Sequence, residues 1–221
     1  MTTQPDPQKL ELLLQSLEQD GFAVIPEFLP AAEIANLAQD AKRLQALGVM
    51  RQAGTGKAAV IARNSAETIR GDFTHWLDDV EDTSPIQQKF LQVMETLRNA
   101  LNQHFFFGLF DLEAHFAIYP PGAAYSKHLD QFHESTHHIK QNQQRQVSCI
   151  LYLNDTWLPT DGGQLRLYLD GTDEVPYRDI EATGGTLVAF LSSRFWHEVM
   201  PAQRERMSIS GWFRKRAEIP A

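Results

Sequence analysis

The sequence predicts a mostly β fold with flanking helices at its N-terminal end. The first half of the 221-residue chain carries apolar residues at helical spacing, in the stretches 10–17, 30–47 and 84–104. The second half carries short runs rich in β-branched and aromatic residues, at 113–119, 146–154, 163–169, 185–191 and 207–213. Turn residues separate these runs. Short strands at such spacing are typical of a β-sandwich or barrel.

Capping residues set the limits of the helical stretches. Gly21 and Gly48 follow the first two stretches, where a glycine commonly ends a helix. Ser84 followed by Pro85 is a typical helix start, because serine caps the free N–H groups and proline suits the first helical position. Between the first two helices, residues 22–26 predict a short strand that ends at a proline.

Composition and charge exclude several classes of protein. Hydrophobic residues make up 43% of the chain, which is enough for a folded core, and the net charge is −8. An acidic chain is a poor nucleic-acid binder, since phosphate contacts need basic clusters. The single cysteine, Cys149, excludes an internal disulfide framework. No signal segment or membrane span is recognisable, so we expect a cytoplasmic monomer without membrane or nucleic-acid partners.

A histidine and an aspartate two residues apart indicate a metal site. His128 and Asp130 share one face of an extended chain, because side chains alternate along a strand. His197, from a distant strand, would complete a set of two histidines and one carboxylate, which is typical of non-haem Fe(II) oxygenases. The chain holds eight histidines, so another could be the ligand, although His115 lies in a predicted strand and is interpreted as a structural residue. Zinc enzymes also use such triads.

A second pattern indicates a carboxylate-binding pocket. Arg206 follows His197 by nine residues and begins a strand-like run in which Ser208, Ser210 and Trp212 would share its face. An arginine with a serine two residues on can clamp a carboxylate, as the far end of a dicarboxylic keto-acid requires. Two tyrosines would serve the same pocket: Tyr152 as a hydroxyl donor and Tyr119 as part of the opposite wall, though each could equally be a core residue.

Taken together, these residues resemble the Fe(II)- and 2-oxoglutarate-dependent dioxygenases, and within them the prolyl 4-hydroxylases of the hypoxia-inducible-factor type and their bacterial relatives. The resemblance extends over residues 119–212, with a weaker signal in the N-terminal helices and in residues 70–76. Its matching strings are Tyr119-Pro120, Tyr125-x-x-His128-x-Asp130, Cys149-Ile-x-Tyr-Leu-Asn154, Gly162-Gly163-x-Leu-Arg166, and His197-Glu-Val-x-Pro-Ala202 with Arg206 and Trp212.

The resemblance implies a fold and a set of site residues. The fold would be a double-stranded β-helix, a jelly-roll and cupin-like core, braced by N-terminal helices. Residues 1–221 would form one oxygenase domain, with a helical part at about 7–105 and the core at about 110–216. His128, Asp130 and His197 would bind Fe(2+), while Arg206 and Tyr152 would bind 2-oxoglutarate. Tyr119 would lie near the iron end of the cosubstrate and Trp212 beside the pocket. Collagen-type relatives use lysine at the position of Arg206, and the animal enzymes carry other small residues in place of Ser208 and Ser210.

The resemblance also implies a reaction and a partner. The enzyme would use dioxygen and 2-oxoglutarate, with ascorbate as a candidate reductant, to convert a prolyl residue of a cytosolic protein to trans-4-hydroxyproline. Succinate and carbon dioxide would be released. Elongation factor Tu is the leading candidate substrate. Residues 134–145 fall where the family has a mobile segment that covers the substrate, but their sequence differs from it. The alternatives are the same chemistry on a free amino acid or small metabolite, and a cupin-like metal-binding sensor without turnover.

Overall fold

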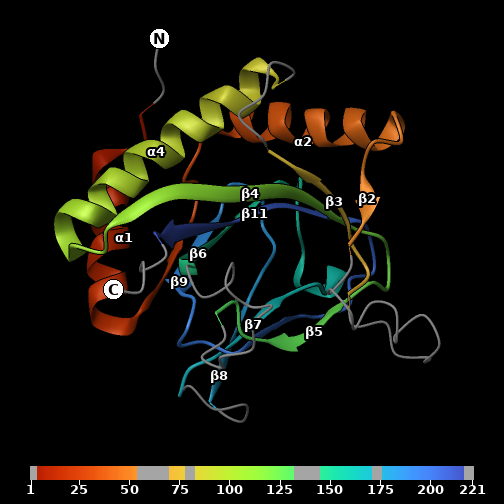
Figure 1. Ribbon diagram of the computed structural model, residues 1–221. Helices are drawn as coiled ribbons and strands as arrows, with labels where there is room; N and C mark the ends of the chain where they lie inside the picture. Colours follow the sequence, from red (N-terminus) through yellow and green to blue (C-terminus); the bar gives the residue numbers. More distant parts are fainter. Residues whose placement is uncertain (1–3, 54–69, 78–82, 132–144, 171–175, 217–221) are drawn as a thin grey trace.

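The computed structural model describes residues 4–53, 70–77, 83–131, 145–170 and 176–216. Within these ranges the chain forms layers: helices cover one face of a seven-stranded sheet, and a four-stranded sheet lies on the opposite face (Figure 1). This confirms the predicted mostly β fold with helices. None of the described helices is long and apolar enough to cross a membrane.

Two of the predicted caps, Gly21 and Ser84, limit the helices as expected. The second helix, in contrast, ends at Ala46 with Leu47 as its C-cap, one residue before Gly48. α1 (Pro7–Asp20) ends at Gly21, whose φ of 80° is the left-handed conformation that glycine adopts without strain. α2 (Ala31–Ala46) and α4 (Pro85–Phe105) cover the same sheet face (Figure 1). The Ser84 hydroxyl accepts a hydrogen bond from a backbone N–H in the first turn of α4, as the cap predicts.

All strand pairs within the two sheets are antiparallel. The larger sheet has the order β1-β9-β6-β11-β4-β3-β2, and the smaller one has the order β5-β10-β7-β8. The strands are β1 (Phe22–Ile25), β2 (Arg51–Gln52), β3 (Phe73–Trp76), β4 (Leu109–Tyr119), β5 (Tyr125–His128), β6 (Arg145–Tyr152), β7 (Leu165–Tyr168), β8 (Tyr177–Ile180), β9 (Leu187–Leu191), β10 (His197–Val199) and β11 (Arg206–Lys215); a short 3-10 turn, η2 (Pro159–Asp161), lies between β6 and β7.

The two facing sheets confirm the double-stranded β-helix that the resemblance implies. The predicted strand 22–26 is present as β1, and β4, β6, β7, β9 and β11 correspond to the five predicted runs of the second half. β1, β2 and β3, from the N-terminal part of the chain, join the same sheet as β4 and β11. The single domain over residues 1–221 stays a prediction, and this shared sheet supports it.

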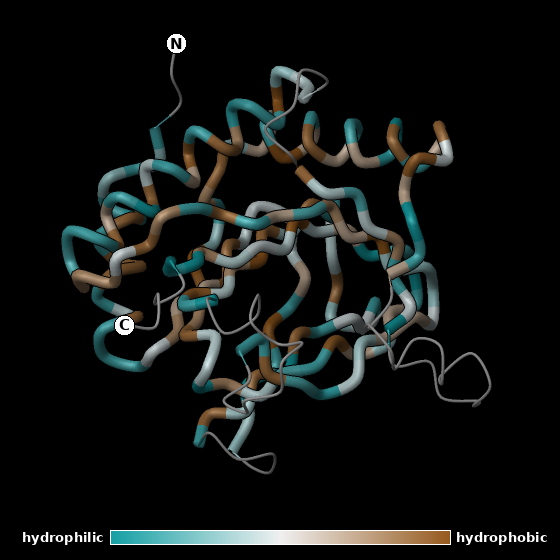
Figure 2. Tube along the Cα trace, viewed as in Figure 1, coloured by the Kyte–Doolittle hydropathy of each residue, from teal (hydrophilic) through white to brown (hydrophobic). Residues whose placement is uncertain are grey.

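The larger sheet separates two hydrophobic clusters. Phe116 and Ile118 of β4 belong to the cluster that contains the helix residues Leu13 and Leu97. The alternate residues of the same strand, Ala117 and Tyr119, belong to the cluster between the two sheets. Figure 2 shows the resulting mixture of apolar and polar positions along the strands. The helices thus cover one face of the sheet and leave the other face for a site.

Candidate active site

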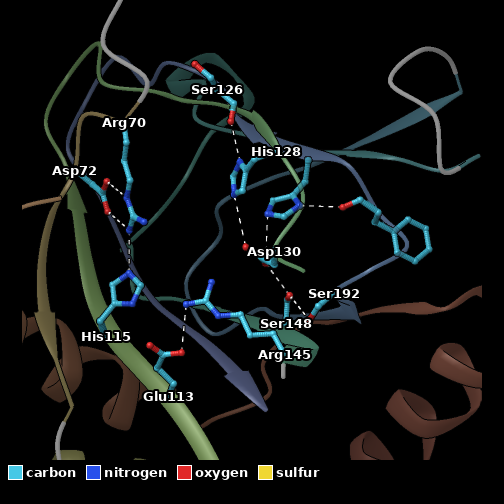
Figure 3. Close-up of polar contacts among 12 residues, drawn as sticks. Arg70, Asp72, Glu113, His115, Ser126, His128, Asp130, Arg145, Ser148 and Ser192 are labelled. Atoms are coloured by element: carbon cyan, nitrogen blue, oxygen red, sulfur yellow. Dashed lines mark hydrogen bonds and ion pairs between the residues drawn. The ribbon is translucent and has the colours of Figure 1, made fainter. Parts of the chain in front are cut away.

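Two histidines and an aspartate from distant parts of the chain converge between the sheets. His128 ends β5, Asp130 follows two residues later, and His197 begins β10, which pairs with β5 so that the two histidines are direct partners. His128 Nε2 lies 3.7 Å from Asp130 Oδ1, and His197 Nε2 lies 3.5 Å from Asp130 Oδ2. One ligand atom from each residue lies within 4.8 Å of the others. The three side chains that the sequence predicts together are therefore brought together (Figure 3).

Hydrogen bonds orient these side chains. His128 Nδ1 donates to the Ser126 carbonyl oxygen at 2.8 Å (Figure 3). His197 Nδ1 donates to the Phe195 carbonyl oxygen at 3.1 Å. With Nδ1 protonated, Nε2 of each ring keeps its lone pair for a metal ion. Asp130 Oδ2 accepts a hydrogen bond from the Ser148 hydroxyl at 2.7 Å. All three groups are thus held with ligand atoms free to bind one ion.

The protonation states suit metal binding. Burial and the neighbouring His197 lower the pKa of His128 to about 3, against the opposing attraction of Asp130. Burial of Asp130 would favour its neutral acid, but the two imidazoles, Arg145 and the Ser148 hydroxyl outweigh burial and lower the pKa of Asp130 to about 2. A neutral imidazole beside an ionised carboxylate is the state in which these groups bind a metal.

The donor set fits Fe(II). Two histidines and one carboxylate on one side of an ion leave the remaining positions open for cosubstrate and dioxygen. The three side chains border a cavity of about 40 Å³ that is partly open to solvent. Tyr119, Ser210 and Trp212, which the sequence predicts in the pocket, also line this cavity.

A buried guanidinium lies next to Tyr119, one of the residues that line this cavity, although Arg206, Tyr152 and Ser208 do not line it themselves. Arg206 is 1% exposed, and its Nε donates to the Gly163 carbonyl oxygen at 2.9 Å. Its Nη1 and Nη2 have no partner among the described residues, and neither do the Tyr152 hydroxyl and the Ser208 hydroxyl. Arg206 Cζ lies 5.0 Å from the ring centroid of Tyr152 and 5.2 Å from that of Tyr119.

Strand register explains why these groups meet. In β11, Arg206 pairs with Tyr119 of β4, and Ser208 pairs with Tyr152 of β6, so all four side chains lie on the inner face of the sheet. Burial raises the pKa of Tyr152, although Arg206 opposes this effect, so its hydroxyl is a neutral donor. A cluster of buried donors without acceptors fits a carboxylate, such as the distal end of 2-oxoglutarate.

Several cavity residues are absent from the sequence prediction. Arg70 forms a bidentate ion pair with Asp72, with nitrogen–oxygen distances of 2.6 and 2.9 Å, and its guanidinium lies 4.8 Å above the Tyr125 ring. That ring stacks on His128 with ring centroids 3.7 Å apart. The weak resemblance of residues 70–76 is the only signal that could have indicated this network. His115, which we interpreted as a structural strand residue, also lines the cavity.

A further contact forms across β11. Arg145 lies 3.5 Å from the Trp212 ring centroid and pairs with Glu113 at 3.2 Å. Of the stretch 134–145, which we compared with the family's substrate-covering segment, only Arg145 is among the described residues. His133, His137 and His138 lie outside them, so the structure does not test these histidines as ligands.

Comparison with known proteins agrees with this geometry. Residues 114–214 match the model of the 2OG-Fe(II) oxygenase superfamily, and residues 17–159 match that of phytanoyl-CoA dioxygenase. A prolyl-4-hydroxylase from Pseudomonas putida is 41% identical, with a TM-score of 0.79 over 94% of this chain and 100% of that chain. A prolyl hydroxylase from Trichoplax adhaerens, solved with a hypoxia inducible factor peptide, is 26% identical, with a TM-score of 0.78 over 94% of this chain and 90% of that chain.

A curated relative extends the comparison to animals. The hypoxia-inducible factor prolyl hydroxylase of Caenorhabditis elegans is 30% identical over 216 residues, which are 94% of this chain and 28% of that protein. The chain thus spans less than a third of the length of the curated relatives that it matches. The chain belongs to the 2OG-Fe(II) oxygenase superfamily, whose members use Fe(II) and 2-oxoglutarate. Its similarity to prolyl 4-hydroxylases of the hypoxia-inducible-factor type confirms the resemblance seen in its sequence.

Gly163 supports the guanidinium, and its replacement tests this contact. Gly163 has a φ of +68°, and an added Cβ would lie 2.9 Å from Ala202 Cβ and 3.1 Å from Arg206 Cδ. Gly48 is a matched control, since its φ is +69° but an added Cβ would meet nothing within 4 Å. We expect Gly48→Ala to lower the free energy of unfolding by about 1 kcal/mol through backbone strain, and Gly163→Ala by about 2–4 kcal/mol through strain and overpacking. Urea denaturation measures both values, and equal losses would show that the contact with Arg206 is unimportant.

Proposed function

We propose that this chain hydroxylates a prolyl residue of a protein substrate, with Fe(II) bound by His128, Asp130 and His197 and 2-oxoglutarate bound by Arg206. The observation that carries the proposal is the pairing of a three-ligand metal site with a buried guanidinium whose Nη atoms have no described partner. Held by His128, Asp130 and His197, Fe(II) would supply the oxidative chemistry in which dioxygen and 2-oxoglutarate give succinate and carbon dioxide and one oxygen atom is added to a C–H bond of the substrate.

The residues of this chain would bind and orient the reactants. Arg206, with Tyr152 and Ser208, would hold the distal carboxylate and so direct the keto-acid end of 2-oxoglutarate toward the metal. Ser210 would lie along the same inner row of β11. Tyr119 and Trp212 would line the two sides of the reaction space, and the apolar cavity residues Ile150, Leu165 and Val199 would exclude water from it.

The comparisons support a prolyl residue as the target. The Pseudomonas putida relative is a prolyl-4-hydroxylase, and the Trichoplax adhaerens relative binds a peptide of the hypoxia inducible factor. A protein substrate fits a cavity that is partly open to solvent better than it fits a closed one. Elongation factor Tu is the candidate that we propose to test, and ascorbate is the reductant that we propose to add.

The metal ligands can be tested one at a time. We expect His128→Ala, Asp130→Ala and His197→Ala each to weaken Co(II) binding, followed by its absorption spectrum, by more than about 100-fold, because a lost ligand costs more than a lost outer partner. Succinate formation with Fe(II) should fall in parallel. His104→Ala is the matched control, since His104 pairs with Glu18 on the helical side. Full turnover in any of the three ligand variants would contradict its assignment.

The carboxylate site can be tested with two neighbouring arginines. Arg206→Ala removes a charge-assisted contact and should raise the half-saturating 2-oxoglutarate concentration roughly 100-fold. Arg204→Ala removes an arginine whose side chain is 47% exposed, and it should leave that concentration unchanged. The measurement is the rate of succinate formation over a range of 2-oxoglutarate concentrations. An unchanged requirement in Arg206→Ala would remove the proposed role.

The substrate is tested by mass spectrometry. Elongation factor Tu, the hypoxia inducible factor peptide and free L-proline are incubated separately with the enzyme, Fe(II), 2-oxoglutarate and ascorbate. We expect the gain of one oxygen atom on a prolyl residue of elongation factor Tu, and none in the Asp130→Ala variant. Reaction of free proline alone would favour the metabolite alternative. Metal binding without any 2-oxoglutarate turnover would favour a sensor.

A further inference from the structure

His115 is a buried polar side chain that neither the metal site nor the carboxylate site uses. It lies on β4, is 1% exposed and lines the cavity together with His128, Asp130 and His197. The metal-ligand cluster of the described residues does not include it. Its Nδ1 is buried and has no hydrogen-bond partner among the described residues. Such a group is rare in folded proteins and requires an explanation.

The contact with Arg70 determines which ring nitrogen of His115 carries the proton. Arg70 Nη2 lies 3.1 Å from His115 Nε2 (Figure 3). A guanidinium only donates hydrogen bonds, so Nε2 must be the acceptor. Burial, together with the positive charges of Arg70 and Arg145, keeps the pKa of His115 well below its usual value against the weaker pull of Asp130. The ring is therefore neutral, and its single proton is on Nδ1.

The ring is held firmly in this orientation. Arg70 is itself fixed by two hydrogen bonds to Asp72, which is fully buried. His115 stacks on Trp212 with ring centroids 5.5 Å apart, and it contacts Trp76 with centroids 4.7 Å apart. In Figure 3 the other ring nitrogen has no partner among the residues drawn. Nδ1–H is thus a fixed, buried donor on a residue that lines the reaction cavity.

A fixed donor without a partner indicates a ligand that accepts a hydrogen bond. A prolyl residue in a peptide has no backbone N–H, so the polar groups around its ring are the carbonyl oxygen of the residue before it and its own carbonyl oxygen. We propose that His115 Nδ1–H donates a hydrogen bond to one of these two carbonyls and thereby positions the target residue. The inference rests on the proposed function and adds a substrate-recognising residue to it.

A pair of amide variants separates the two nitrogens of His115. Asparagine places an amide near the position of Nδ1 and can replace the donor, whereas glutamine reaches the position of Nε2 and preserves only the contact with Arg70. We expect His115→Gln to raise the KM for the prolyl substrate about tenfold, the effect of one lost hydrogen bond, and His115→Asn to raise it about threefold or less. The KM for 2-oxoglutarate should not change in either variant, because Arg206 and not His115 is proposed to hold its distal carboxylate.

The outcomes are distinct. If the role of His115 is purely structural, its substitution should change the stability of the protein or alter all kinetic constants alike. Equal substrate KM values for the two variants, or a wild-type substrate KM for His115→Gln, would overturn the proposal. His104→Asn and His104→Gln are the matched controls on the helical side. If the wild-type enzyme oxidises no prolyl substrate at all, the proposed function fails instead, and the kinetic comparison does not arise.

Nuclear magnetic resonance of the wild-type protein tests the same hydrogen bond without turnover or variants. The protein carries 15N-labelled histidine and Zn(II) in place of iron, with 2-oxoglutarate bound, and acetyl-Ala-Pro-Ala-amide is the probe. We expect the Nδ1 proton of His115 to shift downfield on addition of the probe, whereas those of His128 and His197 already have carbonyl acceptors. An unshifted His115 proton at the highest soluble probe concentration would overturn the proposal, whatever the outcome of the kinetic assays.

Discussion

The pairing of β5 with β10 is the constraint on which the site depends. It makes His128 and His197, which are 69 positions apart in the chain, direct partners across two short strands. Asp130 follows the end of β5 and turns back toward both rings, where Ser148 of the opposite sheet holds its carboxylate. The metal site therefore joins the two sheets. The ligands come from the smaller sheet, while the larger sheet supplies the groups that surround them.

The site and its surroundings hold buried donors that have no acceptor among the described residues. The Nη atoms of Arg206 lie with the hydroxyls of Tyr152 and Ser208 on the inner face of the larger sheet, next to the cavity, and His115 Nδ1 belongs to a residue that lines it. This set of donors matches the proposed reactants. The distal carboxylate of 2-oxoglutarate only accepts hydrogen bonds, and a peptide has no N–H at a prolyl nitrogen. One kind of polar group can thus recognise both the cosubstrate and the substrate.

The sequence alone predicted the positions of site residues that share a strand or belong to one short motif. Alternation along β11 correctly placed Arg206, Ser208, Ser210 and Trp212 on one face, and helix caps located the end of α1 and the start of α4. It was insufficient for the contact between Arg70 and His115, which lie 45 residues apart and meet only because β3 pairs with β4. His115 looked like an ordinary strand residue, because its role depends on which neighbours surround its two nitrogens. These neighbours are determined by the pairing of strands that are distant in the sequence, and local residue spacing does not reveal them.

The unpartnered donors also link ligand binding to stability. A buried polar group without a hydrogen bond destabilises the folded state by about 1–3 kcal/mol, and several such groups lie in and around the site. The apolar cluster on the helix-covered face of the larger sheet stabilises the fold by burial of hydrophobic side chains. Because 2-oxoglutarate and substrate can bind only the folded cavity, each ligand that satisfies these donors stabilises the fold in proportion to its affinity. The same donors therefore make binding specific. A ligand without matching acceptors would leave them buried and unpaired, and its binding free energy would be less favourable.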